Sequence, residues 1–186
     1  LAPGRHTLRN VPRIADVTLM AELLDRMGAT VSRRSDDPDV LTIDVPDLMD
    51  PEAPYDLVEK MRASIVVLGP LLARFGEARV SVPGGDDFGN RPIDMHLRGL
   101  EDLGATFTTS HGVIEGRAER LLGARVLLEY PSVGATENLL LAAVTAKGTT
   151  VIDNAAREPE IADLAAFLTT MGAEVSGGGG STITVE

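Results

Sequence analysis

Two loops in the sequence join a predicted strand to the start of a predicted helix, and both could bind an anion. Unpaired backbone N–H groups and the helix dipole favour negative charge at such a position. The first loop, residues 82–96, contains three glycines that permit mobility and Arg91, whose guanidinium can grip a phosphate or a carboxylate through two hydrogen bonds. A flexible acidic turn with Pro92 at a helix start is the alternative interpretation of the same residues.

The second loop, residues 129–138, reads EYPSVGATEN and leads into an apolar helix. Either Ser132 or Thr136 could serve as the N-cap of that helix. A purely structural cap and an anion-binding site are the two interpretations of this loop.

The composition of the 186-residue chain limits the kinds of partner that it could have. The net charge of −11 repels nucleic-acid backbones and anionic lipid, so local arginines must hold any anionic ligand. The absence of cysteine excludes disulfides and zinc–thiolate sites, and the three histidines are too far apart in sequence to suggest a metal site. The apolar runs are too short to span a bilayer, and no signal-peptide pattern is seen. We expect a cytoplasmic protein without a metal, a nucleic-acid partner or a membrane partner.

Three copies of one unit must position these loops. Each copy has a helical pattern that ends before a Gly-Ala pair, and these patterns cover 17–27, 93–103 and 161–171. Each glycine is predicted to close its helix in the left-handed conformation. Predicted strands precede the helices at 7–11, 79–82 and 149–152, and follow them at 30–31, 40–45, 106–107, 113–116, 174–175 and 182–185. The unit is therefore strand, helix, strand, strand, repeated over about 7–76, 78–147 and 149–186.

Two longer, nearly uncharged helical patterns, 57–75 and 136–146, connect the copies. Their apolar residues surround the helix axis, as in helices buried in a core, and Pro70 is expected to kink or split the first. The sequence thus predicts an α/β fold, an inside-out barrel of three repeated units with buried helices at the centre and sheets outside. Three units require three central helices, so we expect the third from outside this chain and interpret residues 1–186 as a single domain of a larger protein.

Four motifs carry a resemblance that extends over essentially the whole chain. They are RASI with LGPL within 62–71, PGG with RPIDMH within 83–96, PSVGATEN at 131–138 and NAAREPE at 154–160. In this order they resemble the UDP-N-acetylglucosamine enolpyruvyl transferase (1-carboxyvinyltransferase) family, and in particular its domain that bears the mobile active-site loop.

The resemblance implies a transferase of two domains, each built from three repeated units. In this family the 3-hydroxyl of UDP-N-acetylglucosamine adds to phosphoenolpyruvate and the tetrahedral intermediate loses phosphate, which is the first committed step of peptidoglycan synthesis. The resemblance also implies that no metal or organic cofactor is used and that the two substrates are the partners. The isolated domain is expected to be inactive, because the complementary second domain completes the active site.

The resemblance further assigns roles to residues of this chain. Arg62 and Arg91 match arginines that face the substrate anions. Residues 92–95 match the segment that holds the uracil, and residues 132–134 match the segment that meets the diphosphate. Pro131 stands where some members have a diphosphate-binding lysine. The predicted substrate-binding set is Arg62, Arg91, Pro92, Ile93, Asp94, Met95, Pro131, Ser132, Val133 and Gly134.

Asp86 stands where most members of the family carry the loop cysteine that protonates the methylene of phosphoenolpyruvate and is alkylated by fosfomycin. A carboxyl group in a closed site beside other anions is pushed toward its protonated form, so Asp86 can act as the general acid. We therefore predict Asp86 and Arg91 as the catalytic residues. We also predict insensitivity to fosfomycin, because the chain has no thiolate to attack the epoxide.

Two other functions compete with this interpretation. The related shikimate-pathway enolpyruvyl transferase is disfavoured by the motifs at 91–96 and 132–138. A module that binds a nucleotide sugar without chemistry, or that serves as a scaffold, belongs to a different class. The family's lysine–asparagine pair, its proton-accepting aspartate and its second-domain arginine have no match in this chain, as expected for half of an active site.

Overall fold

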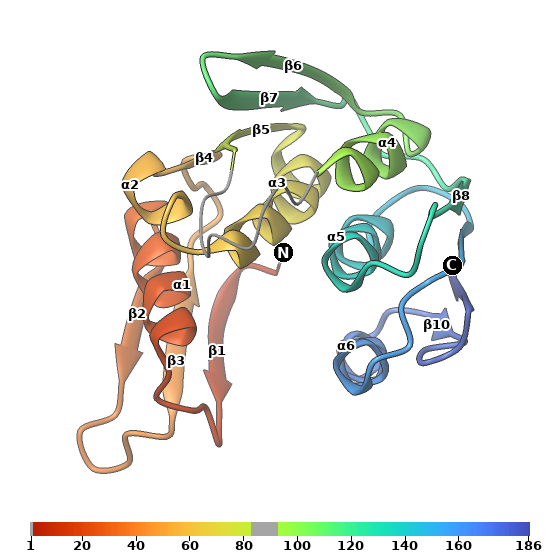
Figure 1. Ribbon diagram of the computed structural model, residues 1–186. Coiled ribbons are helices and arrows are strands. Elements are labelled where there is room, and N and C mark those ends of the chain that lie inside the picture. Colours follow the sequence, from red (N-terminus) through yellow and green to blue (C-terminus); the bar gives the residue numbers. More distant parts are fainter. Residues whose placement is uncertain (1, 83–92) are drawn as a thin grey trace.

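The computed structural model describes residues 2–82 and 93–186, and it contains the same unit three times (Figure 1). The first copy consists of β1 (Gly4–Leu8), α1 (Ala15–Arg26), β2 (Thr30–Arg33) and β3 (Leu41–Val45). The second consists of β5 (Glu77–Ser81), α4 (Asp94–Asp102), β6 (Thr106–Ser110) and β7 (Val113–Arg117). The third consists of β9 (Thr150–Asp153), α6 (Pro159–Thr170), β10 (Val175–Ser176) and β11 (Thr182–Val185). This is the order of elements that the sequence predicts.

Each copy forms its own sheet. The strand orders are β1-β3-β2 in the first sheet, β4-β5-β7-β6 in the second and β10-β11-β9-β8 in the third. The additional strands β4 (Glu52–Ala53) and β8 (Arg125–Leu127) lie parallel to β5 and β9, whereas the other pairs are antiparallel. The sequence does not predict β4 and β8, because two or three residues are too few to show an alternating pattern.

Strand β1 lies three residues earlier than the predicted strand at 7–11. Asn10 has a φ of 57°, which is far from the extended region and ends the strand before it. As a result, β1 pairs with β3 from Gly4 opposite Val45 to Leu8 opposite Leu41.

The three outer helices end in the same way, as predicted. Gly28, Gly104 and Gly172 have φ values of 111°, 96° and 104°. In the first copy the N–H of Gly28 donates to the carbonyl of Asp25, and the next N–H donates to the carbonyl of Leu24, both at 3.0 Å. The other two copies repeat this pair of hydrogen bonds. A side chain would be strained at this φ, which explains the glycine in each copy.

Two helical segments lie between the outer elements (Figure 1). The 3-10 helix η1 (Arg62–Val67) runs directly into α3 (Leu68–Phe75), and the second segment is α5 (Val133–Ala143). A separate short helix, α2 (Tyr55–Val58), precedes η1. The predicted helix over 57–75 is therefore divided near residues 59–61, ahead of Pro70. Pro70 itself lies in the first turn of α3, where a proline is tolerated.

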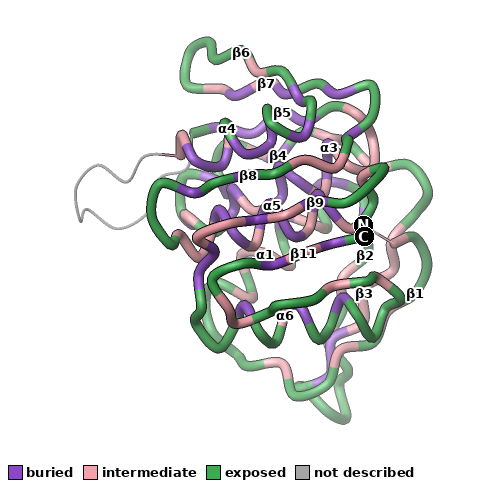
Figure 2. Tube along the Cα trace, turned by 90° about the vertical axis from the view of Figure 1, so that its right-hand side faces the viewer, coloured by how far each residue is buried: buried purple, intermediate pink, exposed green. Residues whose placement is uncertain are grey.

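One hydrophobic cluster extends through all three copies. Its centre is α5, in which Leu139 and Leu140 are fully buried and which contacts η1, α3, α4 and α6. Figure 2 shows buried residues gathered along α5, with more exposed strands around them. Within the part of the chain that the structure describes, no helix is both long and apolar enough to cross a membrane.

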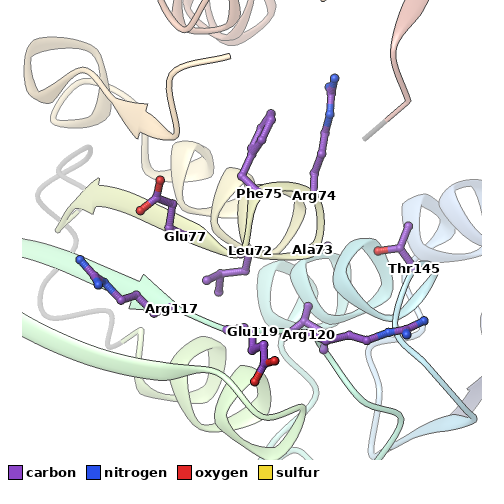
Figure 3. A pocket seen from close by; sticks show the side chains of 12 residues that line it. Leu72, Ala73, Arg74, Phe75, Glu77, Arg117, Glu119, Arg120 and Thr145 are labelled. Carbon is purple, nitrogen blue, oxygen red and sulfur yellow. The ribbon is translucent and has the colours of Figure 1, made fainter. Parts of the chain in front are cut away.

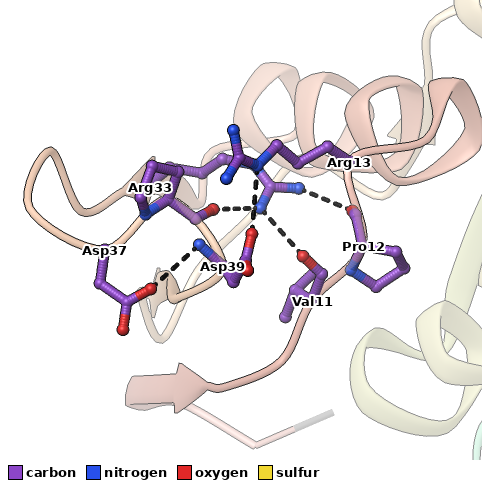
Figure 4. A network of polar contacts seen from close by, with 7 residues as sticks. Val11, Pro12, Arg13, Arg33, Asp37 and Asp39 are labelled. Atoms are coloured by element: carbon purple, nitrogen blue, oxygen red, sulfur yellow. Dashed lines mark hydrogen bonds and ion pairs between the residues drawn. The ribbon is translucent and has the colours of Figure 1, made fainter.

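A network of polar contacts closes the outer end of the first copy (Figure 4). The Arg33 guanidinium donates to three backbone carbonyls, those of Val11 (3.4 Å), Pro12 (3.1 Å) and Pro38 (2.7 Å). Arg33 therefore joins the segment that follows β1 to the turn between β2 and β3.

Replacing Arg33 by alanine is expected to lower the free energy of unfolding by about 1–2 kcal/mol, because three carbonyl groups lose a charged donor. Arg13→Ala is the matched control, since Arg13 makes one exposed ion pair with Asp39 (3.1 Å) and its loss should cost about 0–1 kcal/mol. Urea unfolding of the two variants measures the difference. Equal effects would contradict the role given to Arg33.

Candidate active site

The second predicted loop leads into α5, and Ser132 is the N-cap of that helix. Ser132 has an extended backbone, and its Oγ accepts a hydrogen bond from the Ala135 N–H (3.3 Å). The alternative cap, Thr136, instead donates its hydroxyl to the Ser132 carbonyl (2.8 Å) and accepts from the Ala156 N–H (3.1 Å). The first turn of α5 is thus fixed by hydrogen bonds to Ser132 and to the Ala156 N–H. Backbone N–H groups and the positive end of the helix dipole lie at this turn, where they can attract an anion.

Helix α4 begins beside this turn. His96, in the first turn of α4, is only 5% exposed. A Cβ placed on Gly134 would lie 3.3 Å from His96 Cε1 and 3.6 Å from His96 Nε2. The missing side chain of Gly134 therefore lets the imidazole edge lie against the first turn of α5. The end of the first loop and the start of α5 are brought together at this point.

A buried amide joins four elements beneath the helix ends. Asn138 of α5 is fully buried, and its Oδ1 accepts the N–H of Gly69 in α3 (2.7 Å). Its Nδ2 donates to the carbonyl of Ile65 in η1 (3.0 Å) and lies 3.1 Å from His96 Nδ1 in α4. A Cβ on Gly69 would lie 2.5 Å from both the backbone oxygen and Oδ1 of Asn138, so only glycine permits this close approach. Asn138 therefore sets the relative positions of η1, α3, α4 and α5.

Arg62 is the first residue of η1, the 3-10 helix in which the Ile65 carbonyl accepts a hydrogen bond from Asn138. The backbone just before it is fixed by Ser64, whose hydroxyl donates to the Met61 carbonyl (2.6 Å). Arg62 is half-buried, and its positive charge is near enough to influence the titration of His96. The predicted substrate-binding arginine of η1 is therefore on the same side of the molecule as the start of α5.

The electrostatics of the site follow from these positions. Burial, and after it the charge of Arg62, lower the pKa of His96 to about 4, while Asp94 acts in the opposite direction. His96 is therefore neutral at neutral pH and can donate a hydrogen bond without adding a charge. A guanidinium, a helix N-terminus and a neutral donor together suit an anion with several oxygens, such as a diphosphate.

Among the described members of the predicted substrate-binding set, Pro131 is exposed and Asp94 is half-buried. Asp94 begins α4 and forms an ion pair with Arg98 (3.6 Å), and Pro131 is exposed immediately before the cap of α5. Ile93, Met95 and Val133 belong to the interior. The side chain of Met95 is 5% exposed, and the other two pack against the hydrophobic cluster.

The predicted catalytic residues Asp86 and Arg91, together with Pro92, lie outside the described residues. Within residues 2–82 and 93–186, no three acidic or histidine side chains are grouped so that they could hold a metal ion.

A surface cavity of about 550 Å³ lies at the other end of the central helices (Figure 3). It is lined by the last turn of α3, by Thr145 just after α5 and by charged side chains that include Arg117, Glu119 and Arg120. The 11 residues of α5 separate Thr145 from Ser132 by about 16 Å or more. The cavity therefore lies near the negative end of the α5 dipole, and we do not assign it to the candidate site.

Glu137, next to Asn138 on α5, lies in an environment that disfavours its negative charge. Burial, and after it the negative charge of Glu160, raise the pKa of Glu137 above its ordinary value of 4.5. The folded state thus binds this proton more tightly than the unfolded state. The stabilisation that the protonated Glu137 side chain gives to the folded state is therefore present below pH 4.5, and it is lost as the pH rises through the raised pKa.

Glu137→Gln is therefore expected to stabilise the protein at about pH 8 and to have little effect at about pH 3.5. The gain should stay below about 1 kcal/mol, because the side chain is half exposed and its charge is screened. Glu160→Gln should give a smaller gain of the same sign, since it removes the neighbouring charge but leaves the burial. Thermal unfolding at the two pH values tests this, and a wild type that is more stable than Glu137→Gln at pH 8 would contradict it.

His96 and Asn138 are the residues of the site whose roles the sequence does not reveal. Both belong to motifs of the resemblance, but the pattern of His96 favours capping or packing. The available signal is a polar Asn138 directly before three leucines in an otherwise apolar helix, which indicates a buried hydrogen-bonding role.

The fold is that of the enolpyruvyl transferases. The solved structure of the enolpyruvyl transferase NikO from Streptomyces tendae matches with a TM-score of 0.83 at 24% identity, covering 99% of this chain and 43% of that chain. EPSP synthase from Acinetobacter baumannii matches with a TM-score of 0.73 at 20% identity, covering 100% of this chain and 42% of that chain. At these identities the likeness shows the fold alone.

The chain belongs to the EPSP synthase (3-phosphoshikimate 1-carboxyvinyltransferase) family, whose model matches residues 1–186. Among curated relatives, proteins named UDP-N-acetylglucosamine 1-carboxyvinyltransferase are 55% identical in Gluconacetobacter diazotrophicus, 53% in Corynebacterium jeikeium and 52% in Trichlorobacter lovleyi. Each comparison covers 100% of this chain and 44% of the relative, so the chain spans less than half the length of these relatives. The predicted family resemblance is confirmed.

Proposed function

We propose that the chain is part of a transferase that moves the enolpyruvyl group from phosphoenolpyruvate to the 3-hydroxyl of UDP-N-acetylglucosamine and releases phosphate. The observation that carries the proposal is the meeting of Arg62, the start of α4 and the start of α5 at one place. The names of relatives that are 52–55% identical over the whole chain support this substrate.

In this proposal the diphosphate lies at the first turn of α5, where Ser132 caps the helix and Gly134 leaves room. The N–H groups of the turn and the helix dipole attract its oxygens. Arg62 and Arg91 add positive charge that a chain of net charge −11 does not otherwise offer to an anion. The segment 92–95 is proposed to hold the uracil.

The proposed chemistry is an addition followed by an elimination. The 3-hydroxyl of the sugar gives its proton to a base that the complementary second domain would supply, and its oxygen forms a bond to C2 of phosphoenolpyruvate. A general acid protonates the methylene carbon, which gives a tetrahedral intermediate. Loss of a proton from the resulting methyl group then expels phosphate and restores the double bond. We assign the general acid to Asp86 because a carboxyl in a closed site beside phosphates is held toward its protonated form.

The remaining architecture is also part of the proposal. We infer that residues 1–186 form a single domain of inside-out type, with one further central helix and a complementary second domain supplied by the rest of a longer protein. The chain covers 44% of the length of these relatives, so the remaining length is enough for both the helix and the second domain. On this view the domain alone is inactive, needs no cofactor and works in the cytoplasm on the pathway to peptidoglycan.

Phosphate release by the full-length protein tests the function. With phosphoenolpyruvate present, we expect release with UDP-N-acetylglucosamine and none with shikimate 3-phosphate. The reverse preference would assign the protein to the shikimate pathway, which the family model's description leaves as the second candidate. Calorimetric binding of UDP-N-acetylglucosamine without any phosphate release would instead support a binding module.

A further inference from the structure

The contacts of Asn138 fix which of its two amide atoms is the oxygen. The backbone N–H of Gly69 can only donate, and it lies 2.7 Å from Oδ1. The carbonyl of Ile65 can only accept, and it lies 3.0 Å from Nδ2. A reversed amide would face one donor with another donor and one acceptor with another acceptor. The backbone therefore determines the orientation of the amide.

This orientation determines the tautomer of His96. One proton of Asn138 Nδ2 goes to the Ile65 carbonyl, and the other faces His96 Nδ1 at 3.1 Å. His96 Nδ1 must then accept, so a neutral imidazole carries its proton on Nε2. A proton on Nδ1 would oppose an N–H of Asn138, which agrees with the lowered pKa of His96.

The protonated edge of His96 faces the first turn of α5. His96 Nε2 would lie 3.6 Å from a Cβ on Gly134, the residue that is predicted to meet the diphosphate. The ring is 5% exposed, and its other nitrogen is held by a fully buried amide, so the direction of the Nε2–H is fixed. A fixed N–H donor at a helix N-terminus adds a directed hydrogen bond to the general attraction of the helix dipole for an anion.

We propose that His96 is a substrate-binding residue that donates its Nε2–H to the diphosphate at the start of α5, and that Asn138 is the positioning residue that holds this tautomer. The inference rests on the function proposed above. Because His96 stays uncharged, the site gains a directed hydrogen-bond donor in addition to the positive charge that Arg62 and Arg91 are proposed to supply.

Two amide variants of His96 in the full-length protein separate donation from packing. The Gln amide can reach the position of Nε2 and donate there, whereas the Asn amide reaches only the position of Nδ1. We expect His96→Asn to raise the Kd of UDP-N-acetylglucosamine by about 10- to 100-fold, the usual effect of losing a hydrogen bond to a charged group. His96→Gln should stay within about fivefold of the wild type. Thermal unfolding of both variants controls for a difference in folding.

The tautomer has its own readout. Nitrogen-15 NMR of the histidine rings distinguishes Nδ1–H from Nε2–H, and the His96 signal is assigned by its loss in His96→Gln. We expect Nε2–H in the wild type at neutral pH. In Asn138→Asp the side chain can only accept at this contact, so a proton should appear on His96 Nδ1. A wild type with Nδ1–H, or an unchanged tautomer in Asn138→Asp, would overturn the role of Asn138.

The outcomes also separate this inference from the proposed function. A wild type that neither binds UDP-N-acetylglucosamine nor releases phosphate would refute the proposed function, while the NMR result would still report the tautomer. A wild type that binds, together with equal Kd values for His96→Asn, His96→Gln and the wild type, would refute only the role of His96. Equal losses in both variants would assign His96 to packing and would refute its role as a donor.

Discussion

Asp86→Asn is expected to lower the kcat of the full-length protein by about 100- to 10,000-fold, the range in which general acids act. The amide has nearly the same size as the acid but cannot deliver a proton to the methylene carbon of phosphoenolpyruvate. Binding of UDP-N-acetylglucosamine should change much less, because the groups proposed to bind it, Arg62, Arg91, residues 92–95 and the start of α5, do not include Asp86. Steady-state phosphate release and calorimetry measure the two effects separately.

Asp87→Asn is the matched control, since it removes an equal charge from the adjacent position of the same loop. We expect it to keep kcat within about threefold of the wild type, because no chemical role is proposed for Asp87. Wild-type turnover in Asp86→Asn would refute the assignment of the general acid. Asp86→Cys offers a second check, because it places a thiol where fosfomycin can react, and mass spectrometry should then detect an adduct that is absent from the wild type.

Asn138→Leu is expected to lower the free energy of unfolding by about 3 kcal/mol or more. The substitution keeps a side chain of similar volume but leaves the Gly69 N–H and His96 Nδ1 without the partner that Asn138 provides in a buried place. The Ile65 carbonyl loses the Asn138 donor and keeps the Leu68 N–H. Each orphaned group costs about 1–3 kcal/mol. Urea unfolding measures the loss, and the His96 ring loses its support at the same time.

Thr150→Val is the control for this experiment. Thr150 is fully buried like Asn138, but within the described part of the chain its hydroxyl has no hydrogen-bond partner. Replacing that hydroxyl by a methyl group should therefore leave stability unchanged or raise it slightly. If Thr150→Val were as damaging as Asn138→Leu, the loss would reflect the disturbance of any buried polar position and not the contacts of Asn138.

The outer helices could be predicted from the sequence because their signals are local. The spacing of apolar residues and the Gly-Ala pairs at 28, 104 and 172 lie within a few residues of the helix ends that they determine. The strand β1 was displaced because the φ of Asn10 is a property of one residue that alternation does not report. Likewise, the break before η1 is not marked by a proline, whereas the change from a 3-10 helix to an α-helix at Val67–Leu68 lies just ahead of Pro70.

The candidate site could be predicted only in part. Arg62 and the start of α5 follow from motifs, and the structure places both near His96. The amide network could not be derived in this way, because its partners are 42, 69 and 73 residues apart in sequence and nothing local connects them. Such contacts depend on how the copies pack against one another, which no local pattern of residues encodes.

The large sequence separation between Asn138 and its hydrogen-bond partner in η1 has a consequence for the synthesis of the chain on the ribosome. The Ile65 carbonyl of η1 leaves the ribosome 73 residues before the Asn138 amide that binds it, and Arg62 leaves earlier still. Until α5 has been made and packed, the η1 segment that carries Arg62 lacks the hydrogen bond from Asn138, so a nascent chain cannot present the complete binding site that we propose. Ligand would therefore stabilise completed molecules and not the growing chain.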